Sequence, residues 1–183
     1  MGNSTIAETA STLTATARGG KYLTFALGKE EYGLEILKVR EIIGWLDITA
    51  LPRTPAYVKG VVNLRGQVIV VVDLRAKFAM EATAKTDQTC IIVVEIAHAG
   101  RKLSTGIIVD HVSEVLEIPT ENIEDPPTFS ASVATDFILG MGKVGEAVKI
   151  LLDIDKVLDG DAVAQIVTIT ASGSTPGTTA AAN

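Results

Sequence analysis

Residues 57–78 read YVKGVVNLRGQVIVVVDLRAKF, and residues 137–158 read FILGMGKVGEAVKILLDIDKVL. The two stretches have the same length and align from end to end without a gap. Each contains two aliphatic runs that flank a short polar turn, the pattern of a β-hairpin. Similar residues fall at equivalent positions: Tyr57 and Phe137, Gly60 and Gly140, Leu64 and Val144, Asp73 and Asp153, Phe78 and Leu158.

A second pair of stretches extends the similarity towards the N-terminus. YGLEILKVREII (32–43) aligns with TGIIVDHVSEVL (105–116), and the later copy has a longer loop around ENIEDPPTFSAS. We interpret this as an internal duplication of roughly 65–70 residues. Each copy contains about five short runs rich in valine and isoleucine, which favour strands. Five strands can curl into a small closed barrel without free edges.

Composition restricts the class of protein. The chain has 183 residues, a net charge of -6 and a pI near 4.9, which argues against general nucleic-acid binding. No apolar run approaches the roughly 20 residues of a membrane span, and residues 1–20 do not resemble a signal peptide. We therefore expect a cytoplasmic protein with a disordered arm (1–20), an ordered region (21–158) and a flexible tail (159–183).

Arg65 interrupts the most apolar region of the chain, between Asn63 and Gly66. Three interpretations are open: a structural partner for a buried acid, a catalytic or anion-binding group, or a turn residue displayed to another protein. Its equivalent in the second copy is Gly145, so the fold forms without an arginine there. This comparison weakens the structural interpretation, and the position between two strands favours display.

The sequence contains no recognisable catalytic or metal site. His98 and His111 lack companions at metal-ligand spacing, and Cys90, the single cysteine, lies in an apolar run. GMGKVG lacks the GK[ST] ending of a phosphate loop. Asp73 and Asp153 each follow a strand and precede a short helical segment, where aspartate is a good N-cap. We expect no catalytic residues, no metal and no cofactor, and we expect a binding module.

The segment KVREIIG supports that expectation. A regular strand places Val39, Glu41 and Ile43 on one face, and Arg40 and Ile42 on the other. An apolar edge beside Glu41 and Arg65 would offer a patch with opposed charges. Arginine in a desolvated interface is a common hot spot, worth about 2 kcal/mol or more when truncated.

GLEILKVREI, TPAYVKGVVNLRGQVIVVVDLR and TGIIVDHVSEVLEI, in this order, resemble CheW, the family of bacterial chemotaxis coupling proteins. The resemblance spans residues 21–158. It implies an all-β fold of two intertwined, five-stranded SH3-like barrels with short helices, the second copy covering roughly 88–158. It also implies an adaptor without catalysis, located at receptor arrays beneath the inner membrane. There it would link the cytoplasmic tips of transmembrane chemoreceptors to the regulatory domain of the histidine kinase CheA, with no nucleic acid and no membrane insertion.

The resemblance also suggests two sets of site residues. Those matching kinase-binding positions are Val39, Glu41, Leu64, Arg65 and Gly66. Those matching a receptor-binding groove between the barrels are Asn63, Val68, Cys90 and Val115, with core packing an open alternative for the last two. Val70 stands where many relatives carry proline. A regulatory piece of a kinase or a receiver-fused coupling protein is the competing hypothesis, but the chain has no length left for an ATP-binding or phospho-acceptor domain. The same adaptor in another receptor-linked output also stays open.

Overall fold

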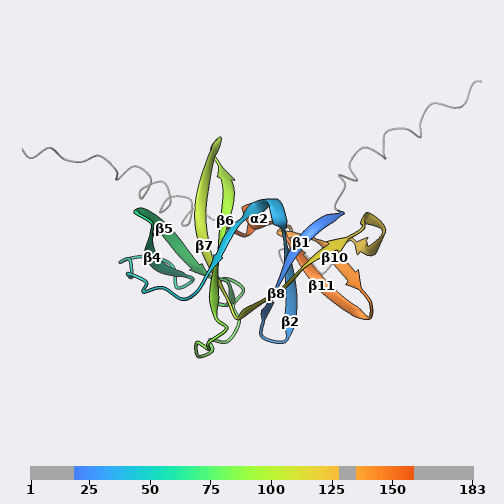
Figure 1. Ribbon diagram of the computed structural model, residues 1–183, viewed down its shortest axis with the longest axis horizontal. Helices are drawn as coiled ribbons and strands as arrows, with labels where there is room; N and C mark the ends of the chain where they lie inside the picture. The colour runs from blue at the N-terminus through green and yellow to red at the C-terminus, as the bar shows by residue number, and fades with distance from the viewer. Residues whose placement is uncertain (1–18, 128–134, 159–183) are drawn as a thin grey trace, which may run out of the picture.

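The computed structural model describes residues 19–127 and 135–158, which form eleven strands and four short helical segments (Figure 1). Within these ranges no helix is long and apolar enough to cross a membrane. Residues 1–18 of the predicted arm (1–20) and the predicted tail (159–183) lie outside the described residues, whereas Gly20 already begins the first strand. The strands are β1 (Gly20–Leu27), β2 (Glu30–Glu35), β3 (Val39–Ile43), β4 (Val58–Leu64), β5 (Gln67–Asp73), β6 (Cys90–His98), β7 (Arg101–Val109), β8 (His111–Ile118), β9 (Ile123–Glu124), β10 (Ile138–Val144) and β11 (Ala147–Leu152). The helical segments are η1 (Ile36–Lys38), α1 (Leu74–Lys77), η2 (Thr120–Asn122) and α2 (Ile154–Leu158).

The strands form two sheets, and each sheet takes strands from both copies of the repeat. The terminal sheet has the order β8-β1-β2-β11-β10-β9, and the central sheet has the order β3-β6-β7-β5-β4. Figure 1 shows the exchange by colour, because the blue β1 and β2 lie in one sheet with the orange β11. The predicted all-β class is confirmed. The terminal sheet has six strands because the two-residue β9 pairs with β10.

Strand register confirms the duplication. Gly33 of β2 lies opposite Leu151 of β11, and Gly106 of β7 lies opposite Val71 of β5, both in parallel pairs. Gly33 and Gly106 occupy equivalent positions in the sequence alignment of the two copies, and so do their partners, Leu151 and Val71. Two strands of the second copy therefore complete the central sheet, and two strands of the first copy complete the terminal sheet.

Gly60 explains how β4 bends. Its φ is +142°, and a Cβ atom at this position would lie 2.0 Å from the carbonyl oxygen of Thr49. The strand carries a register shift between Val58 and Gly60, and β10 has the same shift before Gly140. The predicted close backbone approach at Gly60 is confirmed, and only glycine fits it.

The strands bury side chains on both faces, which explains their nearly continuous apolar runs. On β5, Val70 and Val72 belong to a core shared by the two sheets, whereas Ile69 and Val71 belong to a smaller core within the central sheet. A third core lies within the terminal sheet and contains Tyr22, Ile118 and Leu151. The shared core holds the two sheets together.

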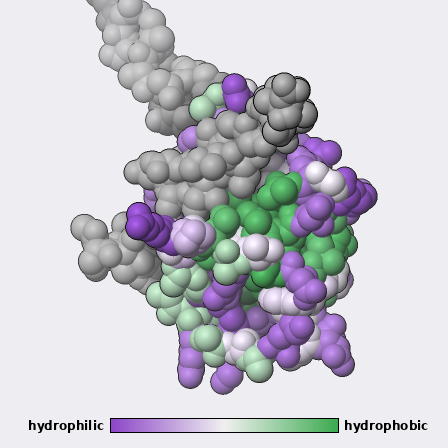
Figure 2. Space-filling view, turned by 90° about the vertical axis from the view of Figure 1, so that its left-hand side faces the viewer, coloured by the Kyte–Doolittle hydropathy of each residue, from purple (hydrophilic) through white to green (hydrophobic). Residues whose placement is uncertain are grey.

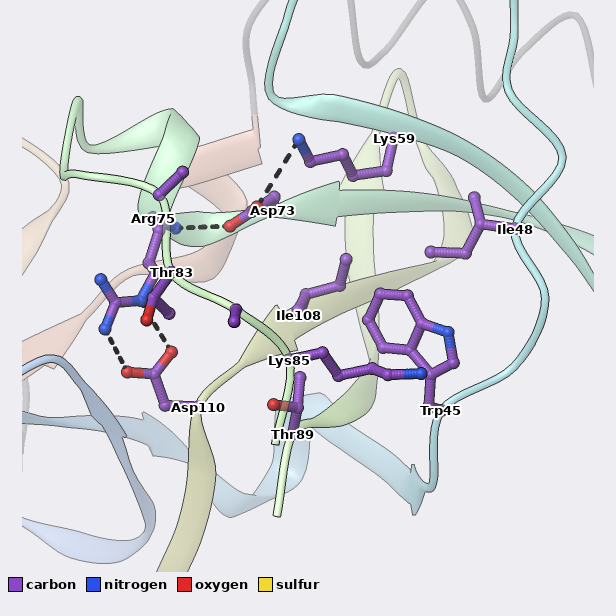
Figure 3. Close-up of a pocket in the computed structure, with 12 residues that line it drawn as sticks. Trp45, Ile48, Lys59, Asp73, Arg75, Thr83, Lys85, Thr89, Ile108 and Asp110 are labelled. Carbon is purple, nitrogen blue, oxygen red and sulfur yellow. Dashed lines mark hydrogen bonds and ion pairs between the residues drawn. The ribbon is translucent and has the colours of Figure 1, made fainter. Parts of the chain in front are cut away.

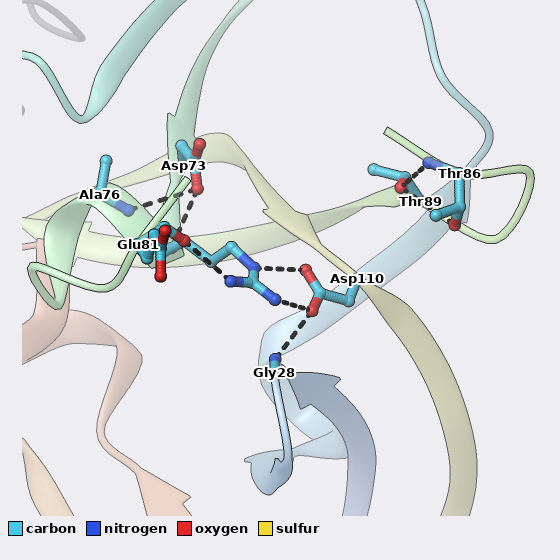
Figure 4. A network of polar contacts seen from close by, with 8 residues as sticks. Gly28, Asp73, Ala76, Glu81, Thr86, Thr89 and Asp110 are labelled. Carbon is cyan, nitrogen blue, oxygen red and sulfur yellow. Dashed lines mark hydrogen bonds and ion pairs between the residues drawn. The ribbon is translucent and has the colours of Figure 1, made fainter. Parts of the chain in front are cut away.

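A polar clamp also joins the sheets, at the N-terminus of α1 (Figure 4). Asp73 accepts hydrogen bonds from the backbone N–H groups of Arg75 (2.9 Å) and Ala76 (3.4 Å), which confirms the predicted N-cap. The Arg75 guanidinium donates to Asp110 from Nε (2.8 Å) and Nη2 (2.5 Å). Asp110 connects β7 to β8 and also accepts from the N–H of Gly28, just after β1 (2.8 Å). The hydrogen bond from Arg75 holds the pKa of Asp110 below its ordinary value.

The duplication provides a second clamp with the charges exchanged. Asp155 of α2 is the sequence equivalent of Arg75, and it accepts from Lys38 Nζ at 2.5 Å, on the β2–β3 crossover. It also accepts from the N–H of Ala97 at 2.8 Å. The hydrogen bond to Asp155 raises the pKa of Lys38. The carboxylate is thus on the strand connection in the first clamp and on the helix in the second.

Candidate partner-binding surface

The β4–β5 hairpin displays Arg65 at its tip. Leu64 pairs with Gln67, which leaves Arg65 and Gly66 as a two-residue loop. Both have positive φ, 51° and 83°, as a type I′ turn requires. The side-chain oxygen of Asn63 accepts from the Gly66 N–H at 2.8 Å and stabilises the turn.

The equivalent hairpin shows what the turn itself requires. Gly145 occupies the position of Arg65 and has a similar φ of 61°. A residue with a side chain in this conformation costs about 1–2 kcal/mol, a strain that glycine avoids. Arg65 is therefore an unfavourable choice for the turn alone, and its side chain has another use.

Arg65 forms an ion pair with Glu41 across the end of the central sheet. Its Nη2 donates to Glu41 Oε2, and the two side chains are 66% and 34% exposed. An ion pair this exposed contributes about 0–1 kcal/mol to stability. Beside it, Glu95 accepts from Arg40 at 2.5 Å and from Lys102 at 2.9 Å. Hydrogen bonds from Lys102, and then from Arg40, hold the pKa of Glu95 below its ordinary value.

These charged groups surround a hollow of about 530 Å³, which we call the hairpin hollow. Its apolar floor contains Leu64, Ile69 and Val93. Three cations and two carboxylates line it, so it has a formal positive excess of one on a chain of net charge -6. Figure 2 views the β4–β5 side of the molecule and shows a group of hydrophobic residues beside hydrophilic ones. The arrangement suits a partner that offers an apolar group flanked by charge.

The predicted placement of Val39 beside Glu41 is wrong. A register shift between these two residues makes Arg40 a bulge, so Val39 lies opposite Val94 and Glu41 lies opposite Val93. Val94 belongs to the shared core and Val93 to the central-sheet core. Because directly opposed side chains lie on the same face, Val39 packs towards the shared core and Glu41 towards the hollow.

Of the candidate kinase-binding residues, the structure brings Glu41, Leu64 and Arg65 together in the hairpin hollow, with Gly66 adjacent in the turn. Val39 lies away from them. The sequence interpretation missed the participation of Arg40, Gln67, Ile69, Val93, Glu95, Lys102 and Ser104. These residues come from β3, β5, β6 and β7, and the sequence did not show that these strands would adjoin.

The candidate receptor-binding residues lie on the faces that the sheets turn towards each other. Asn63 pairs with Val68, and Val68 shares its face of β5 with Val70, which belongs to the shared core. Cys90 packs against that core, and burial raises the pKa of its thiol. Val115 lies opposite Leu23, another shared-core residue, in the terminal sheet.

Their exposures separate these four residues into two groups. Val68 and Val115 are 49% and 50% exposed, whereas Cys90 is only partly accessible. Asn63 and Val68 are near the hairpin tip of the central sheet, and Val115 is in the other sheet. None of the four lines the hairpin hollow. In the described ranges, no three His, Cys, Asp or Glu side chains are grouped so that they could hold a metal ion.

Comparison with known proteins gives a consistent result. The family model for the CheW-like domain matches residues 21–162. The chain is 40% identical over 158 residues to the chemotaxis protein CheW of Klebsiella aerogenes, covering 86% of this chain and 93% of that protein. It is 32% identical over 146 residues to that of Rhizobium meliloti, covering 80% and 92%. A crystal structure of the scaffolding protein TtCheW from Thermoanaerobacter tengcongensis superposes with a TM-score of 0.69 at 35% identity, covering 79% of this chain and 95% of that one.

Proposed function

Because the chain belongs to the CheW-like domain family, we propose that it is a non-catalytic chemotaxis scaffold that couples transmembrane chemoreceptors to the histidine kinase CheA. It would act in the cytoplasm, at receptor arrays beneath the inner membrane. The names of the relatives support the chemotaxis role, and the similarity to TtCheW, a scaffolding protein, supports the scaffolding role. The observation that carries the proposal is Arg65, displayed in a strained turn where the equivalent hairpin uses glycine.

The kinase surface is the hairpin hollow. Glu41 and Arg65 present one exposed charge of each sign above the apolar Leu64, so a partner can exchange their mutual ion pair for contacts of its own. Such an exchange sacrifices little stability, since the exposed pair is worth about 0–1 kcal/mol. Val39 contributes indirectly, because it packs the start of β3 against the shared core. The regulatory domain of the kinase is the proposed occupant.

The receptor surface comprises Asn63, Val68, Cys90 and Val115. The half-exposed Val68 and Val115 offer apolar anchors of the kind that an amphipathic receptor helix uses. Cys90 supports this surface mainly through core packing, because its side chain contacts the shared core. This division assigns the receptor to the faces between the sheets and the kinase to the open end of the central sheet.

Calorimetric titration with the regulatory domain of the host's CheA tests the kinase surface. We expect Arg65→Glu to weaken binding at least tenfold, since an arginine hot spot is worth about 2 kcal/mol or more. Arg53→Glu is the matched control, because Arg53 is also exposed, has a positive φ of 59° and lies outside the hollow. Unchanged affinity in a folded Arg65→Glu variant would remove Arg65 from the kinase surface. Wild-type protein that binds neither the kinase domain nor receptor fragments would contradict the coupling role itself.

A further inference from the structure

A second hollow, of about 380 Å³, lies in the central sheet beside the connection between the two sequence copies (Figure 3). We call it the tryptophan hollow. It is bounded by the segment before β4, which contains Trp45 and Ile48, by the residues at the end of β5, and by residues 82–89. It shares no lining residue with the hairpin hollow. Any ligand it takes is therefore separate from the proposed kinase contact.

The walls of this hollow are largely apolar and include one flat aromatic face. Trp45 is the only tryptophan of the chain, and 39% of it is exposed. Ile48 and Ile108 line the hollow with it, and Figure 3 shows Ile108 lying between the indole and the polar groups at the far side. A partly exposed tryptophan suits contact with a flat or apolar group.

The polar groups leave positive charge available. Three cations and two carboxylates line the hollow, and both carboxylates already have partners. Asp110 accepts both hydrogen bonds from Arg75, and Asp73 accepts from backbone N–H groups of α1. Lys59 Nζ lies 3.8 Å from Asp73, at the limit of an ion pair.

Lys85 is the cation most available to a ligand. Its Nζ lies 4.8 Å from the centroid of the Trp45 ring, and Figure 3 shows its side chain extending alongside the indole. Within the described residues no carboxylate pairs with it. An ammonium group held against an aromatic wall, without an acidic partner, is placed to meet an anion whose apolar part contacts the same wall.

We propose that the tryptophan hollow binds a small amphipathic anion, with a flat apolar body that contacts Trp45 and one carboxylate that pairs with Lys85. Its volume falls within the range of about 300–1,000 Å³ that is usual for small-molecule sites, and it combines apolar walls with polar groups, as such sites do. The site is independent of the adaptor function. A ligand here would contact residues 82–89 and α1, which hold the connection between the copies against the central sheet.

Fluorescence titration of the full chain with phenylbutanoate tests the site, because Trp45 is the sole indole and lines the hollow. Phenylbutanol is the matched uncharged probe. We expect a saturable change in Trp45 emission, with the carboxylate bound roughly tenfold more tightly than the alcohol, as a charge-assisted contact warrants. Lys85→Gln should abolish that difference and leave alcohol binding unchanged.

Lys77→Gln is the matched control, since Lys77 Nζ also lies over an aromatic ring, that of Tyr57, at 4.2 Å and outside the hollow. It should bind phenylbutanoate as the wild type does. Backbone amide shifts of Thr89 and Ile108 provide a second readout that does not depend on tryptophan emission. Equal affinity for acid and alcohol, equal losses in the two lysine variants, or no saturable change in either readout would overturn the proposal.

Discussion

Replacing Asp110 with alanine tests whether the clamp at α1 holds the two sheets together. The variant leaves the Arg75 guanidinium, 16% exposed, without its carboxylate, and leaves the N–H of Gly28 without its acceptor. Breaking one side of a fully buried pair costs about 3–5 kcal/mol. Because Asp110 is 24% exposed and water can reach it, we expect a smaller loss, about 2–4 kcal/mol of the free energy of unfolding.

Urea unfolding measures this loss directly. With an m-value of about 2 kcal/mol/M, in the middle of the usual range, the midpoint should fall by roughly 1–2 M. A double-mutant cycle with Arg75→Met should give a coupling of about 1.5–3 kcal/mol, since both hydrogen bonds of the pair are charged. The same cycle on Glu41 and Arg65 is the control and should give about 0–1 kcal/mol. Equal coupling in the two cycles would refute the reasoning that burial and paired geometry make the clamp structural.

Two further predictions concern acid stability and the bend in β4. Because the pKa of Asp110 is lowered in the folded state, Asp110 contributes stability that is present above its unfolded pKa, near 4, and is lost as pH falls through the folded pKa. Urea midpoints measured at decreasing pH should therefore fall less steeply below pH ~4 in Asp110→Ala than in the wild type. Parallel curves would contradict this prediction. Gly60→Ala should destabilise the protein by about 3 kcal/mol or more, because its Cβ would lie 2.0 Å from the Thr49 carbonyl oxygen at a φ of +142°. Gly44→Ala is the control, since nothing lies within 4 Å of the Cβ atom it would add. Equal thermal midpoints for the two variants would rule out the predicted clash.

The sequence was sufficient to predict the duplication, the all-β class and the Asp73 cap because each leaves a local signal. Repeated residues at fixed offsets reveal the copies, and an aspartate between a strand and a helical run predicts the cap. The exchange of strands between sheets leaves no such signal. It depends on parallel pairs such as Gly33 with Leu151, whose partners come from opposite ends of the ordered region.

The partner surface was predicted only in part, for the same reason. Glu41 and Arg65 could be paired from their residue types, but the bulge at Arg40 inverted the predicted face of Val39. A bulge adds one residue to a strand and reverses the alternation beyond it, and no glycine or proline marks this one. The tryptophan hollow was not predicted at all, because Trp45, Lys85 and Ile108 come from three separate segments.

The two copies differ at the hairpin hollow and at the equivalent region of the terminal sheet, and this difference makes the two ends of the molecule unlike. Ile69 on the floor of the hairpin hollow is replaced in the terminal sheet by Lys149, which is 7% exposed and paired with Glu31. That carboxylate also accepts a hydrogen bond from Ser113 at 2.9 Å, so the equivalent region of the terminal sheet is occupied by an internal polar network. The same backbone thus has one end with an apolar floor and exposed, exchangeable charges, and another end whose polar groups already satisfy one another. A partner surface complementary to the hairpin hollow would desolvate Lys149 and Glu31 if it bound at the terminal sheet, and it would form no new charge pair there. One kind of partner therefore cannot use both ends equally.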